Sequence, residues 1–255
     1  MKFLIWLAIL PSVIIGLLVY KADKVEQEPK KELIKALFMG FFSVIITLFL
    51  SWVMGVMKIN YNTLHSIQII LYSFIGVAFV EEFSKWIATK LFITNNKNYN
   101  YLFDGIVYAV FVSLGFATVE NILYTLSGGV ITAIVRAVVT VPSHAFYAIF
   151  MGYYLSKAKE SKIEDNQQDN VKYTLYSIFI PTVLHGIFDS LLLLENPLLL
   201  ILFLLFVVFL YIISIQKVKE LARSEKLFIT KKIGFCSNCG VKVYGKYCSN
   251  CGKEL

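Results

Sequence analysis

Long apolar stretches separated by short polar loops restrict the fold of this chain more than any other feature. Seven of them have about the 20 residues that an α-helix needs to cross the hydrocarbon core of a bilayer. They lie near residues 3–20, 34–57, 67–93, 102–126, 129–156, 172–194 and 197–216. The alternative is a soluble all-helical protein, but 58% hydrophobic and 16% charged residues are unusual for a soluble domain. We therefore predict an all-α, polytopic membrane bundle of about seven transmembrane helices.

The first stretch has an alternative interpretation as a signal peptide. Only Lys2 precedes it, and no small-x-small cleavage site follows it. A retained membrane anchor, with a kink at Pro11, fits these features better.

Lysine and arginine residues are concentrated in alternate loops. Many follow the first, third, fifth and seventh stretches, whereas the loops at 58–66, 127–128 and 195–196 contain only Lys58. Positively charged loops stay in the cytoplasm, so we predict a multi-pass membrane protein with its N-terminus outside and its C-terminus in the cytoplasm. The same lysines explain the net charge of +7 without a nucleic-acid partner.

The tail FCSNCGVKVYGKYCSNCGKEL contains two CxxC pairs. They hold all four cysteines of the chain, Cys236, Cys239, Cys248 and Cys251. Four thiolates at this spacing are typical of a closed, structural zinc site. Two disulfides are the alternative, but the predicted cytoplasmic location disfavours them. We predict a zinc ribbon over 233–255 that can bind a cytoplasmic partner, a basic linker over 217–232 and a membrane domain over 1–216.

Ionisable residues interrupt four consecutive apolar stretches, the third to the sixth. They are Glu81, Glu82, Lys85, Glu120, Arg136, His144, His185 and Asp189. A charged side chain inside a bilayer is costly and usually marks a functional site in the bundle interior. Spacings of three or four residues put Glu82 with Lys85, and His185 with Asp189, on shared helix faces. We expect these side chains to meet in one layer of the bundle.

Histidines and carboxylates together suit a hydrolytic metal site. Such ligands hold zinc while leaving a position for water, and a further glutamate can accept the proton of that water. Each residue also has a structural interpretation: the histidines as hydrogen-bond partners between helices, Glu82 with Lys85 as an ion pair, and Arg136 as a counter-ion. Asp104 is expected to cap a helix. The glycines are expected to allow close helix packing; they are Gly105, Gly115, Gly152 and Gly186.

Four motifs, in this order, resemble those of the PrsW family of bacterial intramembrane proteases, relatives of the CAAX-protease and bacteriocin-processing superfamily. They are EExxK at 81–85, the run FDGIVYAVFVSLGFATVENILY at 103–124, His144, and HGIFD at 185–189. The resemblance covers roughly residues 66–194, the motif core of the membrane domain. The run at 103–124 departs from the family pattern at Ala109 and Ser113, where glycine is common, and this difference concerns packing more than chemistry.

The resemblance implies an intramembrane endopeptidase of the bacterial plasma membrane. It implies that this enzyme cuts a membrane-anchored, single-pass substrate such as an anti-sigma factor, at or near the outer face of the bilayer. It implies these catalytic residues: Glu81 and Glu82 from EExxK, Glu120 from FxxxE, His144 from the third motif, and His185 and Asp189 from HxxxD.

Two mechanisms are compatible with this resemblance. In the one that we favour, His144 and His185 bind a divalent metal, expected to be zinc, together with Glu120 or Asp189, and Glu81 or Glu82 is the general base. In the other, glutamate and histidine activate water directly, and His185 with Asp189 stabilises the oxyanion.

Two further functions compete with proteolysis. Intramembrane Glu, His and Lys residues also form the proton relays of transporters, but the sequence shows neither the paired repeats nor the broken helices that transporters often have. A non-catalytic membrane scaffold that works through its zinc ribbon is the second alternative. The intact EExxK motif and both histidines argue against it.

Overall fold

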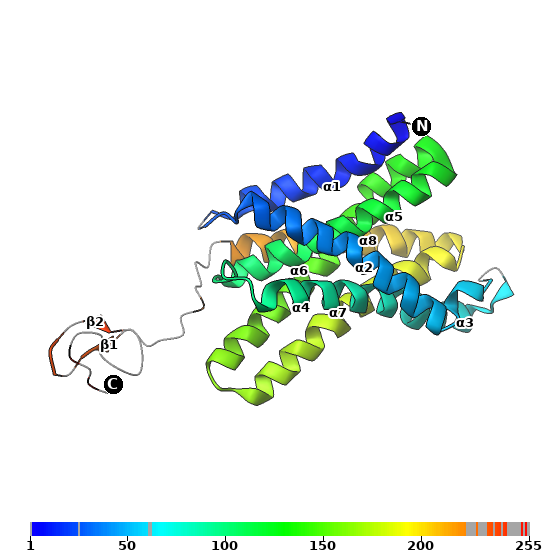
Figure 1. The fold of residues 1–255 in the computed structure, drawn as a ribbon. Coiled ribbons are helices and arrows are strands. Elements are labelled where there is room, and N and C mark those ends of the chain that lie inside the picture. Colours follow the sequence, from blue (N-terminus) through cyan, green and yellow to red (C-terminus); the bar gives the residue numbers. More distant parts are fainter. Residues whose placement is uncertain are drawn as a thin grey trace.

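Helices make up almost all of the computed structural model, which describes residues 2–24, 26–60, 63–222, 228, 234–236, 238–240, 242–243, 251 and 253. The elements are α1 (Lys2–Ala22), α2 (Lys30–Val53), η1 (Val56–Lys58), α3 (Ser66–Leu71), the π-helix η3 (Tyr72–Phe79), α4 (Val80–Thr94), α5 (Leu102–Val138), α6 (Thr140–Ile163), α7 (Gln167–Leu193), α8 (Pro197–Leu221) and the paired antiparallel strands β1 (Gly234–Phe235) and β2 (Lys242–Val243) (Figure 1). The predicted all-α membrane architecture is confirmed for this part of the chain.

Six segments of the described chain are long and apolar enough to cross a membrane. They are Lys2–Ala22, Lys30–Val53, Ser66–Thr94, Leu102–Ile163, Gln167–Leu193 and Pro197–Leu221. The fourth contains 62 residues. A straight helix of that length would measure roughly 90 Å, about three times the thickness of the hydrocarbon core. It does not run straight, because Gly129 has φ +76° and ψ −161°.

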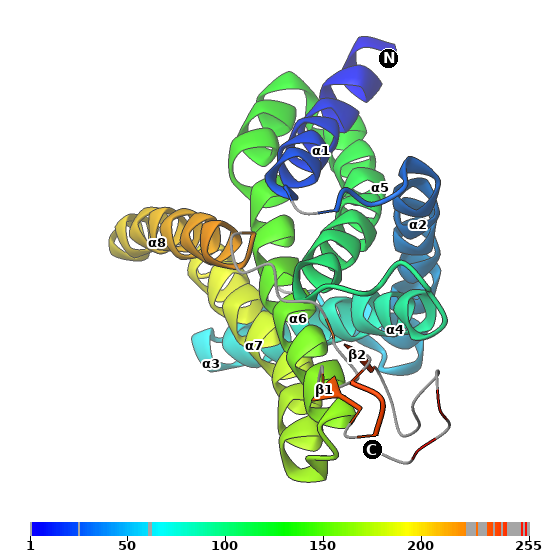
Figure 2. The same ribbon diagram turned by 90° about the vertical axis from the view of Figure 1, so that its left-hand side faces the viewer.

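The chain reverses its direction at Gly129, beside the predicted loop at 127–128, and a second break at Val139 separates α5 from α6. The predicted fourth and fifth spans, 102–126 and 129–156, therefore correspond to the two legs on either side of Gly129, and the second leg includes the junction of α5 with α6 at Val139. Figure 2 shows the two legs of this hairpin meeting near the N-terminus of α1. The predicted helix ends also shift, because α7 begins at Gln167 and α8 includes the first residues of the predicted linker, 217–221.

The hairpin of α5 and α6 is the core of the bundle. In the apolar stretch of this segment 94% of the residues are buried, whereas only 22–33% are buried in the corresponding stretches of the other five segments. The exposed leucine, isoleucine and phenylalanine side chains of those five segments suit contact with lipid. Glycines allow the backbones of neighbouring helices to pack closely against α5. A Cβ atom on Gly40 of α2 would overlap the backbone of α5 at Val112, and one on Gly152 of α6 would overlap Gly105. Close packing at the predicted small residues is thereby confirmed.

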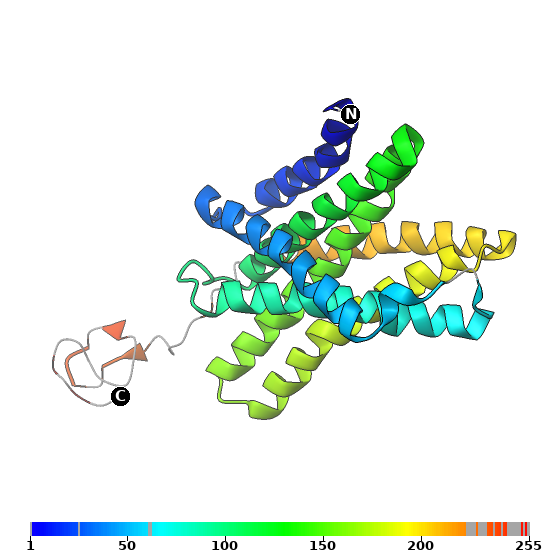
Figure 3. The ribbon, with the colours of Figure 1, turned by 45° about the vertical axis from the view of Figure 1, so that its right-hand side comes forward.

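The connections α1–α2, α4–α5 and α6–α7 lie toward one end of the bundle, and α7–α8 and the segment before α3 lie toward the other (Figures 1 and 3). Contacts join the first set. Asn100 donates to Glu26, Lys159 donates to the carbonyl oxygen of Tyr99, and the N–H of Phe228 donates to the carbonyl oxygen of Asn100 at 2.7 Å. The lysine-rich loops predicted to lie on one side of the membrane therefore share one end of the molecule.

Asp104 starts α5 as predicted. Its Oδ2 accepts hydrogen bonds from the backbone N–H groups of Asn100, at 2.8 Å, and Tyr101. These donors would otherwise be unsatisfied at the beginning of the helix, so the carboxylate fixes where α5 leaves the preceding loop.

Candidate active site

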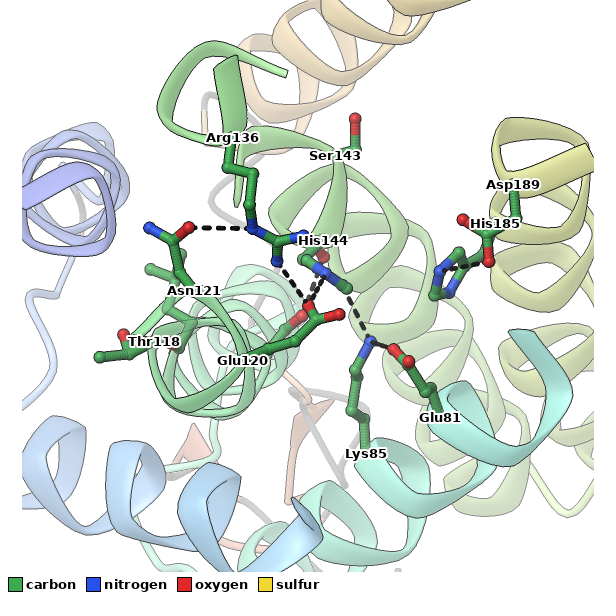
Figure 4. A network of polar contacts seen from close by, with 12 residues as sticks. Glu81, Lys85, Thr118, Glu120, Asn121, Arg136, Ser143, His144, His185 and Asp189 are labelled. Atoms are coloured by element: carbon green, nitrogen blue, oxygen red, sulfur yellow. Dashed lines mark hydrogen bonds and ion pairs between the residues drawn. The ribbon is translucent and has the colours of Figure 1, made fainter. Parts of the chain in front are cut away.

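The six residues predicted to be catalytic come from four helices and converge inside the bundle. Glu81 and Glu82 lie on α4, Glu120 on α5, His144 on α6, and His185 and Asp189 on α7; five of them, all but Glu82, line a cavity of about 270 Å³ (Figure 4). Its wall also includes Tyr72 and Val77 of the π-helix η3. π-Helical segments are rare and are often found at functional sites. Here the segment leads directly into the two glutamates.

Lys85 joins the α4 carboxylates to α6. Its Nζ lies 2.8 Å from Oε1 of Glu82, 3.4 Å from Oε2 of Glu81 and 3.0 Å from Nδ1 of His144. The ammonium also lies 4.3 Å from the ring centroid of Phe116. Lysine offers only donors, so Nδ1 of His144 accepts this hydrogen bond and the imidazole proton resides on Nε2.

The second nitrogen of His144 faces Glu120. Nε2 lies 2.8 Å from Oε2 of Glu120, and the same oxygen pairs with Nη2 of Arg136 at 3.0 Å. Arg136 is the counter-ion that the sequence predicted. Its Nε donates to Oδ1 of Asn121 at 3.0 Å (Figure 4). Asn121 in turn donates to the carbonyl oxygen of Ala8 in α1. The first helix is thus connected to the site.

His185 lies between two carboxylates. Its Nδ1 is 2.9 Å from Oε1 of Glu82, and its Nε2 is 3.4 Å from Oδ2 of Asp189. Oε1 of Glu82 therefore contacts both Lys85 and His185, while its Oε2 is buried without a hydrogen bond. Burial of an unpaired carboxylate is costly, and these two cationic or polar partners offset part of that cost.

The paired glutamates have different surroundings although they are adjacent in sequence. The Glu81 side chain is 12% exposed and faces the cavity, whereas that of Glu82 is 1% exposed and held between Lys85 and His185. Successive residues of a helix point about 100° apart, so α4 directs one carboxylate at the cavity and the other at α7.

The imidazole nitrogens and carboxylate oxygens on these helices are groups that commonly bind divalent metals in proteins. Two groups have ligand atoms within 4.8 Å of one another: Glu81 with Glu120 and His144, and Glu81 with Glu82 and His185. The first group fits a metal better, because all its members line the cavity, whereas Glu82 of the second group does not. A metal on Nε2 of His144 would displace the proton now facing Glu120. The predicted ligands His144 and His185 thus fall into different groups.

Sequence reasoning did not single out Tyr147, Ser143, Asn121 or Tyr124. Tyr147 lies flat against the ring of His185, with ring centroids 4.9 Å apart and an interplanar angle of 19°. Arg136 lies over the ring of Tyr124 at 4.2 Å. Aromatic and small polar residues are ordinary in apolar helices, so the only available signal was helical spacing from His144 and Glu120.

The predicted zinc ligands lie partly outside the described residues, because Cys248 is one of those not described. Sulfur atoms of Cys236, Cys239 and Cys251 lie within 4.8 Å of one another, and Sγ of Cys236 is 3.5 Å from Sγ of Cys251. Three of the four predicted ligands thus lie close together.

Comparison with known proteins gives a consistent result. A family model described as "PrsW family intramembrane metalloprotease" matches residues 28–215. The chain is 35% identical over 227 residues to Protease PrsW of Clostridioides difficile (strain 630), covering 87% of this chain and 93% of that protein. It is 34% identical over 173 residues to Protease PrsW of Bacillus subtilis (strain 168), covering 68% and 75% of the two chains. No solved structure matches the chain.

Proposed function

The chain belongs to the PrsW family of intramembrane metalloproteases, and from this membership we propose that it hydrolyses a peptide bond of a membrane-anchored, single-pass protein of the anti-sigma-factor type. The observation that carries the proposal is the cavity that Glu81, Glu120, His144, His185 and Asp189 line together. A water molecule, a general base and polar groups for the scissile carbonyl must meet where lipid would otherwise exclude water. This cavity provides that place.

Glu81 is the general base in this proposal, because its carboxylate faces the cavity. It accepts a proton from water as the water oxygen attacks the carbonyl carbon, and it delivers that proton to the amide nitrogen as the C–N bond breaks. Glu82 is a positioning residue that holds Lys85 and His185. Asp189 orients His185 from the opposite side of the ring.

Glu120 and His144 would hold the metal that the family implies, with the Glu81 carboxylate beside them left free to act as the base. A bound divalent ion such as zinc supplies a Lewis acid for the water and the carbonyl oxygen. Arg136 would balance the charge of Glu120 at the edge of that group. Lys85 donates to Nδ1 of His144, so a metal on Nε2 requires Lys85 to give up that contact.

The test of the proposed function is cleavage of a candidate substrate in cells. Each single-pass anti-sigma factor of the source bacterium is tagged at both ends and co-expressed with the parent chain, Glu81→Gln, His144→Ala or the matched control Glu220→Gln. Glu220 is exposed on α8 and pairs with Lys217. We expect the parent and Glu220→Gln to cut one substrate and the other two variants to leave it intact. Equal cleavage by Glu81→Gln would overturn the role of Glu81.

Metal content separates the two possible metal sites. We propose that Cys236, Cys239, Cys248 and Cys251 hold one structural zinc in a cytoplasmic ribbon that binds a cytoplasmic partner. Purified protein should then lose one equivalent in Cys236→Ser with Cys239→Ser. It should lose a second, separate equivalent in His144→Ala with Glu120→Gln. Active protein without the second equivalent would support the metal-free mechanism.

We also propose seven membrane crossings. The two legs of Leu102–Ile163, counted separately on either side of Gly129, join the other five apolar segments. The lysine-rich end of the bundle then faces the cytoplasm, with the N-terminus outside.

A further inference from the structure

Tyr147 is a cavity residue that the mechanism above does not use. It lies on α6, three residues after His144, and only 1% of its surface is exposed. Its hydroxyl is buried and makes no hydrogen bond. Buried hydroxyl groups usually have a partner, so this one, with the Ser143 hydroxyl as its polar neighbour, is available to donate to a group that enters the cavity.

Three aromatic contacts fix the direction of the phenol ring. The ring stacks on His185, with centroids 4.9 Å apart, and meets His144 and Phe188 edge-on at 6.2 Å and 6.4 Å. Preorganised donors stabilise a developing charge because they need not reorient during the reaction. The hydroxyl of Tyr147 is preorganised in this sense.

The other strong donors around the cavity are already engaged. Nδ1 of His185 faces Glu82 and its Nε2 faces Asp189; Nε2 of His144 faces Glu120. Arg136 donates from Nε to Asn121, and its Nη2 forms an ion pair with Glu120 at 3.0 Å without hydrogen-bond geometry. The hydroxyl of Ser143, one turn before Tyr147, donates to the carbonyl oxygen of Val139. Among the buried polar residues that line the cavity, Ser143, His144, Tyr147 and His185, only the tyrosine hydroxyl makes no hydrogen bond.

We propose that Tyr147 is a further catalytic residue, whose hydroxyl donates a hydrogen bond to the oxygen of the scissile carbonyl. This inference rests on the proposed proteolytic function. When the water oxygen bonds to the carbonyl carbon, the π-electron pair of the C=O bond moves onto oxygen, and the hydrogen bond strengthens as that negative charge develops. The proton stays on Tyr147 throughout, so the residue exchanges no atom with the substrate.

The variant that tests this role is Tyr147→Phe, which removes the hydroxyl and retains the ring that stacks on His185. We expect kcat for the dual-tagged substrate to fall about 100-fold with KM little changed, as for loss of one oxyanion donor elsewhere. The thermal midpoint should not fall, since the variant removes a buried hydroxyl that has no partner. Tyr154→Phe, about two turns further along α6, is the matched control and should leave both quantities unchanged.

Two results would overturn the inference. One is a Tyr147→Phe enzyme that turns over as the parent does. The other is a fall in activity that accompanies a matching fall in the thermal midpoint, which would indicate a packing role. Glu81→Gln is assayed in parallel: if it is inactive while Tyr147→Phe is fully active, only the role of Tyr147 fails. If both retain full activity, the proposed catalytic site fails as well.

Discussion

Buried carboxylates occur at two places in this bundle, and their partners differ. In the cavity region, Glu82 has Lys85 and His185 as partners at less than 3 Å. At the lysine-rich end, Glu28 accepts a hydrogen bond from Tyr108 but faces two further acids, Asp23 and Asp104. Burial, together with these acids, raises the pKa of Glu28 from 4.5 to about 8. The surroundings of Glu28, in the loop between α1 and α2, therefore favour the protonated form of its carboxyl.

At the residue scale, Glu28→Gln should stabilise the protein as the pH rises. Between pH 4.5 and 8 the unfolded chain releases the Glu28 proton while the folded chain retains it, so folding stability falls across this range. The amide of glutamine keeps an acceptor for Tyr108 and cannot ionise. We expect equal thermal midpoints for parent and variant at pH 4.5 and a higher midpoint for the variant at pH 8.

Glu26→Gln is the control for this measurement. Glu26 lies two residues earlier, is exposed, and accepts a hydrogen bond from Asn100. Its replacement should not change the pH dependence. A Glu28→Gln protein whose midpoint follows that of the parent at every pH would show that the carboxyl is ionised in the folded state.

At the element scale, glycines decide how closely the helices approach. Gly40 of α2 lies against Gly115 of α5, and a Cβ atom on either would overlap backbone atoms of the other helix. Without a hydrophobic driving force between helices in lipid, such packing is a main source of association. The positions of α2 and α5 therefore depend on a pair of residues with no side chains.

Gly40→Ala should destabilise the bundle by about 1–3 kcal/mol, the usual effect of overpacking. Gly16→Ala on α1 is its matched control, since a Cβ atom there would lie 3.5 Å from Phe111, an ordinary contact. Alanine is the better helix former, so the control should be neutral or stabilising. Thermal unfolding in detergent measures both. Equal midpoints for the two variants would contradict the close approach of α2 and α5.

Gly129→Ala should weaken the reversal within α5. A φ of +76° with a ψ of −161° is a conformation that is essentially restricted to glycine, and its cost for other residues is about 1–3 kcal/mol. Because the return leg carries Arg136 to Glu120, activity should fall together with the thermal midpoint. Ser127 is a nearby exposed residue, so Ser127→Ala should change neither the activity nor the thermal midpoint. An unchanged midpoint in Gly129→Ala would show that the turn tolerates a side chain.

At the scale of the whole molecule, the lysine-rich loops predict which loops lie on each side of the membrane, and cysteine labelling can test that orientation. In a chain whose four cysteines are replaced by serine, Lys97→Cys and Ser127→Cys each introduce one exposed thiol. The positive-inside rule places the first in the cytoplasm. A membrane-impermeant maleimide should label intact cells through Ser127→Cys and should label Lys97→Cys only after permeabilisation. The reverse pattern would invert the proposed orientation.

Much of the architecture could be predicted from local sequence. Apolar length indicates membrane helices, lysine positions group the loops, and helical spacing pairs Glu82 with Lys85 and His185 with Asp189; all of these are properties of short segments. The predicted spans 102–126 and 129–156 correspond to the two legs on either side of Gly129, but the interruption of the second leg at Val139 was not predicted. Hydropathy measures only apolar content, and it cannot detect a break in a helix that remains apolar on both sides.

The sequence by itself determined which charged residues lie within the bundle. A charged side chain in a membrane span is costly, and it is recognisable in the sequence because it interrupts an apolar stretch. Only the tertiary structure decided what each of them contacts. Glu81 and Glu82 are equivalent in the motif, and the rotation of α4 against α6 and α7 directs one to the cavity and the other to Lys85 and His185. Tyr147 is one aromatic residue among many until His185 is packed against it. Contacts between helices depend on how the helices are rotated and how closely they approach, and those quantities arise only when all the helices pack together.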